Sequence, residues 1–207
     1  MQAIKAYTQI YGDINGQEIL KKIEACGRVC YKSEAKIAKG SAEKFVAHLI
    51  KRGHEAVLEH ASFTVKFVVD RGVSHEIVRH RIASYCQESQ RYCNYSKDDF
   101  GKEITFIIPH YLDYKSAGWN VWKDTMKACE DAYFKLLDIG LLPQEARAVL
   151  PNSTKTEVVM TADLREWRTF FKLRTSNAAH PQMLEVTRPL LDELKELIPV
   201  VFDDITY

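Results

Sequence analysis

The residues best suited to chemistry in this chain are concentrated between positions 79 and 92. This segment reads RHRIASYCQESQRY and contains three arginines, one histidine and two serines. An arginine guanidinium is a planar fork of donors that matches a phosphate in a bidentate manner and keeps its charge near neutral pH. Several arginines beside a serine hydroxyl therefore predict a site for a phosphomonoester or a pyrophosphate. An ordinary solvated surface would have a similar composition, so the spacing must decide.

The glycines exclude one common way of binding such a phosphate. The chain has nine glycines, and none of them forms a G-x-G-x-x-G or a Walker-type loop. A glycine-rich turn at a helix N-terminus therefore cannot cradle the phosphates of a nucleotide here. Side chains must bind them instead.

The composition indicates a globular protein with an unremarkable charge balance. The 207 residues are 46% hydrophobic and 28% charged, with a net charge of +1. This length predicts a single domain spanning residues 1–207. Without a positive excess, binding of duplex nucleic acid has no electrostatic basis. We found no apolar leader and no apolar run of membrane-spanning length, and we therefore expect a cytoplasmic protein without membrane partners.

Five cysteines are predicted to be reduced thiols rather than parts of a disulfide framework, because their number is odd and no secretory signal precedes them. Cys26 and Cys30 are four residues apart, which places them on one face of a helix as buried structural thiols. Cys86 is also expected to be a packed thiol.

The elements that must position these residues follow from periodicity and end signals. Ser41 is a plausible N-cap with Gly53 as a stop, Gly140 ends a long helix, and Asp163 with Glu166 forms a capping box. Helices are expected at 17–29, 41–52, 72–81, 116–139 and 163–173, and also from Pro143 and from Pro181; strands are expected at 3–10, 62–70, 103–109 and 154–161. This order predicts an α+β fold.

Two functions of other classes compete with nucleotide chemistry. A metallohydrolase could use the histidines and glutamates of the chain, but the HExxH pattern fails at Leu58, and His54 and His60 are six residues apart, on different faces of a helix. Stoichiometric zinc would revive this reading, although we expect no metal. A non-catalytic binder of nucleotides or single-stranded RNA could stack bases on Tyr85, Tyr92 and Tyr95. Salt-dependent oligonucleotide binding without flavin would favour that alternative.

The spacing resembles the signature of one family. Arg-His-Arg, then seven residues, then Ser, then Arg two positions later is similar to the signature of the flavin-dependent thymidylate synthases. Three further blocks of that family are similar to segments of this chain. They are GHEAVLEH at 53–60, ARAVLP at 146–151, and a stretch from DLREW at 163–167 through Leu173 and Arg174 that is followed by HPQ at 180–182. Four ordered blocks thus support the resemblance from about residue 50 to residue 190.

The resemblance implies an activity, a fold and an assembly. The implied reaction is the reductive methylation of dUMP to dTMP with 5,10-methylenetetrahydrofolate and NADPH through bound FAD, catalysed by a methyltransferase. The implied fold is a mostly antiparallel sheet packed with helices, assembled as a homotetramer with shared active sites. Because the flavin carries the redox chemistry, no covalent link between enzyme and nucleotide is required, and Ser89 is assigned to binding rather than to nucleophilic attack.

The resemblance also implies roles for individual residues. Arg174 is the catalytic position, where a fixed cation stabilises negative charge on the pyrimidine; on its own it would be a cation at the end of a helix. The implied dUMP contacts are Glu76, Arg79, Gln87, Glu88, Ser89, Gln90, Arg91, Arg147 and Arg174. The implied FAD contacts are His54, Glu59, Arg79, His80, Arg81, Gln87, Asp163, Arg165 and Thr169.

Several positions depart from the family pattern. Gln87 stands where some members have Glu, Asp163 where Asn is frequent, and Ala56 where Ser or Thr is common. Ala56 cannot donate a side-chain hydrogen bond. Glu76 would repel a phosphate unless it binds a sugar hydroxyl or an arginine. These departures affect the details of positioning rather than the class of reaction.

Overall fold

The structure is a computed structural model that describes residues 1–97 and 101–207. The chain divides into two compact units, which we describe separately. Unit 1 comprises residues 1–7, 67–79 and 86–159, and unit 2 comprises residues 8–66, 80–85 and 160–207. The single domain expected over residues 1–207 stays a prediction.

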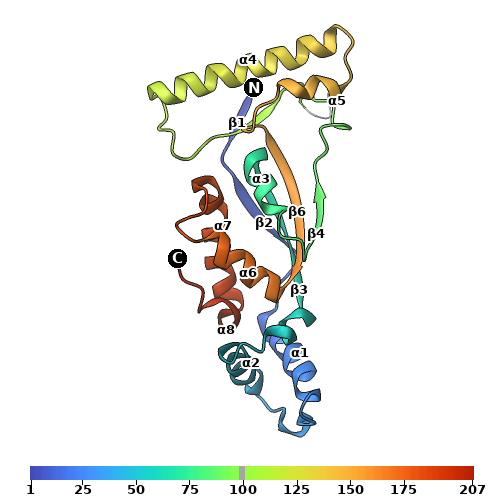
Figure 1. The fold of residues 1–207 in the computed structure, drawn as a ribbon, viewed down its shortest axis with the longest axis vertical. Coiled ribbons are helices and arrows are strands. Elements are labelled where there is room, and N and C mark those ends of the chain that lie inside the picture. The colour runs from blue at the N-terminus through green and yellow to red at the C-terminus, as the bar shows by residue number, and fades with distance from the viewer. Residues whose placement is uncertain (98–100) are drawn as a thin grey trace. The chain divides into compact units, whose positions relative to one another are not determined.

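Helices and strands alternate along the chain, as expected for an α+β fold (Figure 1). The strands are β1 Gln2–Ile4, β2 Tyr7–Tyr11, β3 Ser62–Asp70, β4 Ser84–Gln87, β5 Thr105–Ile107 and β6 Lys155–Asp163. The α-helices are α1 Gly16–Val29, α2 Ser41–Lys51, α3 Arg71–Ile77, α4 Ala117–Asp138, α5 Pro143–Ala146, α6 Leu164–Arg174, α7 Pro181–Leu197 and α8 Pro199–Phe202. Short 3₁₀ helices are η1 Glu34–Lys36, η2 Glu55–His60 and η4 Arg147–Val149.

The strands form a four-stranded sheet in the order β2-β3-β6-β4 and a two-stranded sheet of β1 and β5. The hydroxyls of Thr64 and Thr161 lie 2.8 Å apart, and the Leu164 amide donates to the Ala61 carbonyl at 3.0 Å. Partner numbers fall along β6 as they rise along β3, so these two strands are antiparallel. The β1–β5 pair is parallel, with Ala3 opposite Phe106, and is an exception to the expected antiparallel pattern.

Unit 1 has its own apolar core beneath the long helix α4. Tyr95, Ile104, Phe106, Met126 and Tyr133 are buried together there. The structure confirms the long helix predicted from Ser116, since the Ser116 side chain caps α4 by accepting from the Trp119 amide at 3.1 Å. Gly140 follows α4 at φ +97°, a conformation that favours glycine.

Unit 2 is built around an aromatic cluster on α6. The rings of Phe63 and Trp167 stack with centroids 4.7 Å apart, and Phe171 packs against both Trp167 and Phe202. Trp167, Phe171 and Phe202 are fully buried, and each such side chain stabilises the fold by roughly 1.5–3 kcal/mol. Asp163 caps α6 by accepting from the Glu166 amide at 2.8 Å.

Of three predictions about helix ends, two were wrong and one was confirmed only in part. The helix expected at 72–81 runs instead from Arg71 to Ile77, and beyond its end the Tyr85 hydroxyl donates to the His80 carbonyl at 2.7 Å. Ser41 is not an N-cap: Gly40 occupies that position at φ +75°, and the Ser41 hydroxyl donates to Glu24 instead. Only the Asp163 half of the capping box forms, since the Glu166 side chain binds His80.

Other differences concern strands, the last helix and cysteines. The strand expected at 3–10 is split between β1 and β2, the one expected at 103–109 shortens to β5, and Pro199 opens a further helix, α8. All five thiols are free, as predicted. Cys30 and Cys86 are exposed rather than buried, because Cys30 lies just beyond the end of α1 and Cys86 occupies an outward-facing position of β4.

Candidate functional site

The signature segment, residues 79–92, folds as a short connection, the strand β4 and a turn. The turn, residues 89–93, is closed by the amides of Tyr92 and Cys93, which donate to the Ser89 carbonyl at 3.2 and 2.9 Å. The Ser89 hydroxyl accepts from the Arg91 amide at 3.3 Å. We call residues 89–93 the signature turn. It presents the Ser89 hydroxyl and the Arg91 side chain from one compact segment.

Arg91 connects the signature turn to the segment that carries Arg147. Its Nε donates to Gln144 Oε1 at 3.4 Å. Gln144 lies on α5, three residues before Arg147, and residues three apart on a helical turn are neighbours. Unit 1 therefore places the two sequence-distant arginines near each other. The resemblance implied that both of them contact dUMP.

Four arginines of the predicted site are exposed cations that have no counter-ion among the described residues. Arg79, Arg81, Arg91 and Arg147 are all exposed, and none of them forms an ion pair with any carboxylate in residues 1–97 and 101–207. Arg165 and Arg168 elsewhere in the chain do pair with carboxylates, at 2.6 and 3.1 Å. The positive charge of the signature segment is thus available to an anion from outside the chain.

Glu88 anchors the start of the signature turn. Its carboxylate accepts from the Tyr95 hydroxyl at 2.8 Å and from Lys155 at 2.9 Å, and Lys155 also contacts Glu157 at 2.8 Å. Burial by itself lowers the pKa of Lys155. Hydrogen bonds to Glu157 and Glu88 outweigh that effect, so the pKa is raised. The Glu88 amide donates to the Glu157 carbonyl at 2.9 Å. The Glu88 side chain is therefore already engaged within the protein.

Two glutamines of the segment behave differently. Gln87 donates from Nε2 to the hydroxyls of Ser74 and Thr156, at 3.1 and 3.3 Å, both of which are fully buried. Gln90 is 8% exposed, and its buried Nε2 has no hydrogen-bond partner in the described part of the chain. A buried donor without a partner costs roughly 1–3 kcal/mol. A bound ligand would recover that cost at Gln90.

Glu76, the remaining predicted dUMP contact of unit 1, is half-buried on α3.

A second group of predicted residues meets in unit 2. His80 Nδ1 lies 3.0 Å from Glu166 Oε1, and Arg174 Nε donates to His80 Nε2 at 3.1 Å. The His80 ring also packs edge-on against Phe170, with centroids 4.9 Å apart. Both ring nitrogens of His80 therefore have protein partners.

The environment of His80 favours the neutral imidazole. Burial is the largest influence and lowers the pKa of His80. The hydrogen bond to Glu166 raises this pKa, whereas the charge of Arg174 lowers it further. Burial and the charge of Glu166 raise the pKa of the neighbouring Tyr85 to about 12. The Tyr85 hydroxyl therefore stays protonated and donates to the His80 carbonyl.

The other predicted flavin contacts in unit 2 are mostly exposed. His54, Glu59, Arg81, Arg165 and Thr169 lie at the surface of that unit, and Asp163 is half-buried. Arg165 pairs with Glu59 at 2.6 Å, which brings two residues 106 positions apart together. The Asp163 carboxylate is used as the N-cap of α6. Arg79 and Gln87 are the predicted flavin contacts that belong to unit 1.

Sequence reasoning missed Lys155 and the side chain of Glu166. Lys155 lies on a strand in which polar and apolar residues alternate, and this pattern indicated an exposed position. Glu166 fitted a capping box. No local signal shows that either would contact a residue more than 60 positions away.

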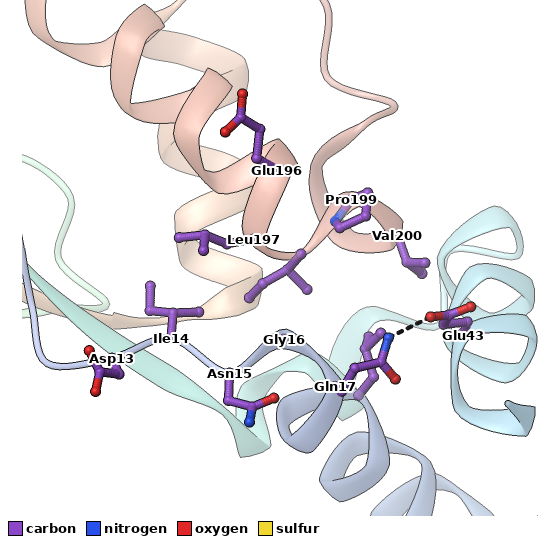
Figure 2. Close-up of a pocket in the computed structure, with 12 residues that line it drawn as sticks. Asp13, Ile14, Asn15, Gly16, Gln17, Glu43, Glu196, Leu197, Pro199 and Val200 are labelled. Atoms are coloured by element: carbon purple, nitrogen blue, oxygen red, sulfur yellow. Dashed lines mark hydrogen bonds between the residues drawn. The ribbon is translucent and has the colours of Figure 1, made fainter. Parts of the chain in front are cut away.

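Two of the cavities among the described residues bear on this site. One of about 330 Å³ in unit 1 is lined partly by Glu88, Tyr95 and Lys155. The other, of about 630 Å³, lies in unit 2, where Gln17 donates to Glu43 (Figure 2). Its lining, as far as the structure describes it, holds carboxylates and no Lys or Arg. That charge would repel a pyrophosphate.

The described residues contain no cluster of three or more His, Cys, Asp or Glu side chains arranged to hold a metal ion. Within the same residues, no helix is sufficiently long and apolar to cross a bilayer.

The chain is similar in sequence to known proteins. The family model described as "Thymidylate synthase complementing protein" matches residues 14–200. A protein of Geobacter sulfurreducens named flavin-dependent thymidylate synthase is 34% identical over 189 residues, covering 88% of this chain and 80% of the relative. A protein of Pyrococcus horikoshii with the same name is 38% identical over 170 residues, covering 80% and 69%.

A solved structure is also similar. The UMP/dUMP methylase PolB from Streptomyces cacaoi, bound with 5-Br dUMP, superposes with a TM-score of 0.80 over 98% of this chain and 96% of that one. The sequence identity is 19%, so this likeness supports the fold alone.

Proposed function

Since the chain belongs to the family of the flavin-dependent thymidylate synthases, the thymidylate synthase complementing proteins, we propose that it methylates dUMP to dTMP, with 5,10-methylenetetrahydrofolate as the carbon donor and NADPH as the reductant. FAD is the cofactor, and when bound it supplies the redox chemistry of the reaction. We further propose a homotetramer in the cytoplasm, in which subunits share active sites.

The observation that carries this proposal is the uncompensated charge of the signature segment. Arg79, Arg91 and Arg147 are exposed guanidiniums of unit 1 without a carboxylate partner in the described residues. A nucleotide monophosphate is an anion with three oxygens that accept bidentate hydrogen bonds from such groups. The Ser89 hydroxyl adds a neutral donor. We assign these four residues to the phosphate of dUMP.

Other residues orient the nucleotide and its pyrimidine. The buried Nε2 of Gln90 lacks a partner within the described chain, and we assign it a ligand oxygen as acceptor. Arg174 is a fixed cation that stabilises the pyrimidine as N3 loses its proton, because a neighbouring positive charge lowers the pKa of an acid. The Glu88 side chain holds the signature turn, so its ligand contact runs through the backbone. Glu76 is proposed to bind a sugar hydroxyl.

The flavin contacts fit an anionic cofactor in part. Arg79 and Arg81 have no carboxylate partner in residues 1–97 and 101–207, which suits the FAD pyrophosphate. Arg165 is paired with Glu59 at the surface, so Arg165 must exchange Glu59 for FAD when the cofactor binds. His54, Asp163, Thr169, Gln87 and His80 complete the proposed set.

Binding of dUMP by the purified protein tests this assignment. We expect a yellow protein that absorbs near ~450 nm or takes up added FAD. With FAD present, calorimetry should detect dUMP binding and a much weaker binding of deoxyuridine, which lacks the phosphate. Arg91→Gln should weaken dUMP binding by roughly tenfold or more, since hydrogen bonds to charged groups contribute about 1.5–3 kcal/mol. Lys22→Gln, at another exposed cation, is the control. Equal affinity for dUMP and deoxyuridine would overturn the phosphate site.

A further inference from the structure

A histidine links the two ends of helix α6 in unit 2. Glu166 is in the first turn of α6 and Arg174 is its last residue. Glu166, Phe170 and Arg174 are spaced by four residues, which places all three on one face of the helix. The His80 ring contacts each of them: Glu166 at 3.0 Å, the Phe170 ring at a centroid distance of 4.9 Å, and Arg174 at 3.1 Å.

The donors and acceptors of this chain of contacts permit one arrangement of protons. A guanidinium has five N–H donors and no acceptor. Because Arg174 Nε donates to His80 Nε2, that nitrogen must carry a lone pair. The neutral imidazole then has its proton on Nδ1, where it donates to the Glu166 carboxylate. The tautomer of His80 is thus fixed by its two neighbours.

We propose that Glu166 and His80 are positioning residues for Arg174, in which the Glu166 carboxylate fixes His80 as the Nδ1–H tautomer and His80 Nε2 orients the guanidinium through its Nε. This inference rests on the proposed function, because it takes Arg174 as the group that meets the pyrimidine. It adds an acidic residue with no assigned role to the machinery of that site.

Burial makes this arrangement rigid. The side chains of His80 and Glu166 are 5% and 9% exposed, so water does not compete for their hydrogen bonds. The His80 backbone is held by the Tyr85 hydroxyl at 2.7 Å, and the Glu166 backbone by the Asp163 cap at 2.8 Å. Burial and the charge of Arg174 keep the pKa of His80 below its usual value, so the Nε2 lone pair is present at neutral pH.

The consequence for Arg174 is orientation before the ligand arrives. An arginine side chain has several rotatable bonds, and ordering it on binding costs affinity. With Nε directed to His80, the remaining N–H donors lie on the Nη nitrogens at the outer end of the fork. His80 thus fixes the Nε edge of the guanidinium and, with it, the plane of the fork.

The substitution Glu166→Gln tests the proposal with little change in size. An amide at position 166 can donate to Nδ1, which allows the Nε2–H tautomer, and that hydrogen would face the Arg174 Nε–H. Protein labelled with ¹⁵N-histidine reports the tautomer directly, and the His80 signal among seven histidines is assigned from its loss in His80→Gln. Affinity of the FAD-bound protein for dUMP is measured in parallel. Asp204→Asn is the control, because it removes a carboxylate that pairs with Arg168 of the same helix.

The expected result in the wild type is a protonated Nδ1 and an unprotonated Nε2 at His80. Glu166→Gln should move the proton toward Nε2 and weaken dUMP binding about tenfold, whereas Asp204→Asn should do neither. A wild-type His80 protonated at Nε2 would overturn the proposal even if Glu166→Gln failed to fold. So would unchanged dUMP affinity in a folded Glu166→Gln protein. If the wild type binds no dUMP, the proposed function fails, and the histidine spectrum still decides the tautomer by itself.

Discussion

Lys155 and Glu88 form an ion pair of 2.9 Å that joins the start of strand β6 to the residue just before the signature turn. Both side chains are largely buried, at 20% and 15% exposure. Lys155 also contacts Glu157, and the Tyr95 hydroxyl completes the surroundings of Glu88. The turn that presents Ser89 and Arg91 is therefore supported by a cation from a distant strand.

Lys155→Met is expected to loosen the signature turn. It leaves Glu88 and Glu157 without their shared cation, and a partly buried pair broken on one side costs roughly 1–3 kcal/mol of stability. We expect the KM for dUMP to rise more than kcat falls, because we propose that the turn binds the substrate. Urea unfolding and steady-state kinetics measure the two effects. Lys21→Met, which removes an exposed pair with Glu18, should change neither; an equal effect in both variants would contradict the role of Lys155.

Arg168→Met is expected to destabilise unit 2 strongly. Arg168 is 1% exposed and holds Glu55, Asp204 and the Val201 carbonyl around one guanidinium. Breaking such a buried pair from one side costs roughly 3–5 kcal/mol, and the partial exposure of Asp204 favours the lower end. The midpoint of urea unfolding, compared with that of Lys21→Met, measures the loss. A loss below about 1 kcal/mol would show that the cluster does not stabilise the fold.

Acid should weaken the fold through His80. Its pKa is lowered in the folded protein, chiefly by burial, with the hydrogen bond to Glu166 opposing and the charge of Arg174 assisting. Between the usual histidine pKa of about 6.5 and the lowered value, the unfolded chain therefore binds more protons than the folded one. The contribution of His80 to the free energy of unfolding is thus present above pH 6.5 and is lost as the pH falls toward the lowered pKa.

Unfolding free energies at pH 7.5 and pH 5 in the wild type and in His80→Gln check this expectation. The wild type should lose more stability than the variant over that interval. The carboxylate of Asp204, whose pKa is lowered by Arg168, titrates in both proteins and therefore cancels from the comparison. Equal losses in the two proteins would contradict the assignment to His80.

Cys86→Ala is expected to keep both stability and activity. The Cys86 thiol is exposed on β4, and surface substitutions usually change stability by less than about 0.5 kcal/mol. The proposed reaction uses no enzyme-bound nucleotide, so no thiolate is required. Turnover of dUMP by the variant, with matched flavin content, decides the matter. An inactive but folded variant would reopen a covalent route through this cysteine.

The elements with strong periodicity were predictable from the sequence, and the tertiary contacts of the site were not. The helix from residue 17, the strand at 62–70 and the helix from Ser116 appear within a residue or so of their expected bounds, because their burial patterns and end signals are local. The helix from Gly72 ends at Ile77, earlier than expected, and the Tyr85 hydroxyl binds the His80 carbonyl beyond its end. That contact depends on how the chain returns, which no local pattern records.

The candidate site divides in the same way. The spacing of the signature segment made Arg79, Ser89 and Arg91 candidates for the site, since the residue types themselves carry the chemistry, and their roles stay a prediction. The side chains that contact the candidate residues and their neighbours could not be predicted from the sequence. Glu166 lies 86 positions from His80, and Lys155 lies 67 positions from Glu88. Their roles follow from burial and geometry, which the linear pattern does not contain.

Formation of dTMP by purified protein is the most direct test of the account. Wild-type protein supplied with FAD, NADPH, 5,10-methylenetetrahydrofolate and dUMP should form dTMP, and omission of any one of them should stop the reaction. Arg174→Ala, folded as judged by circular dichroism, should form no detectable dTMP. Flavin-loaded wild-type protein that forms none would contradict the proposed function, and near-normal turnover by Arg174→Ala would remove Arg174 from its role.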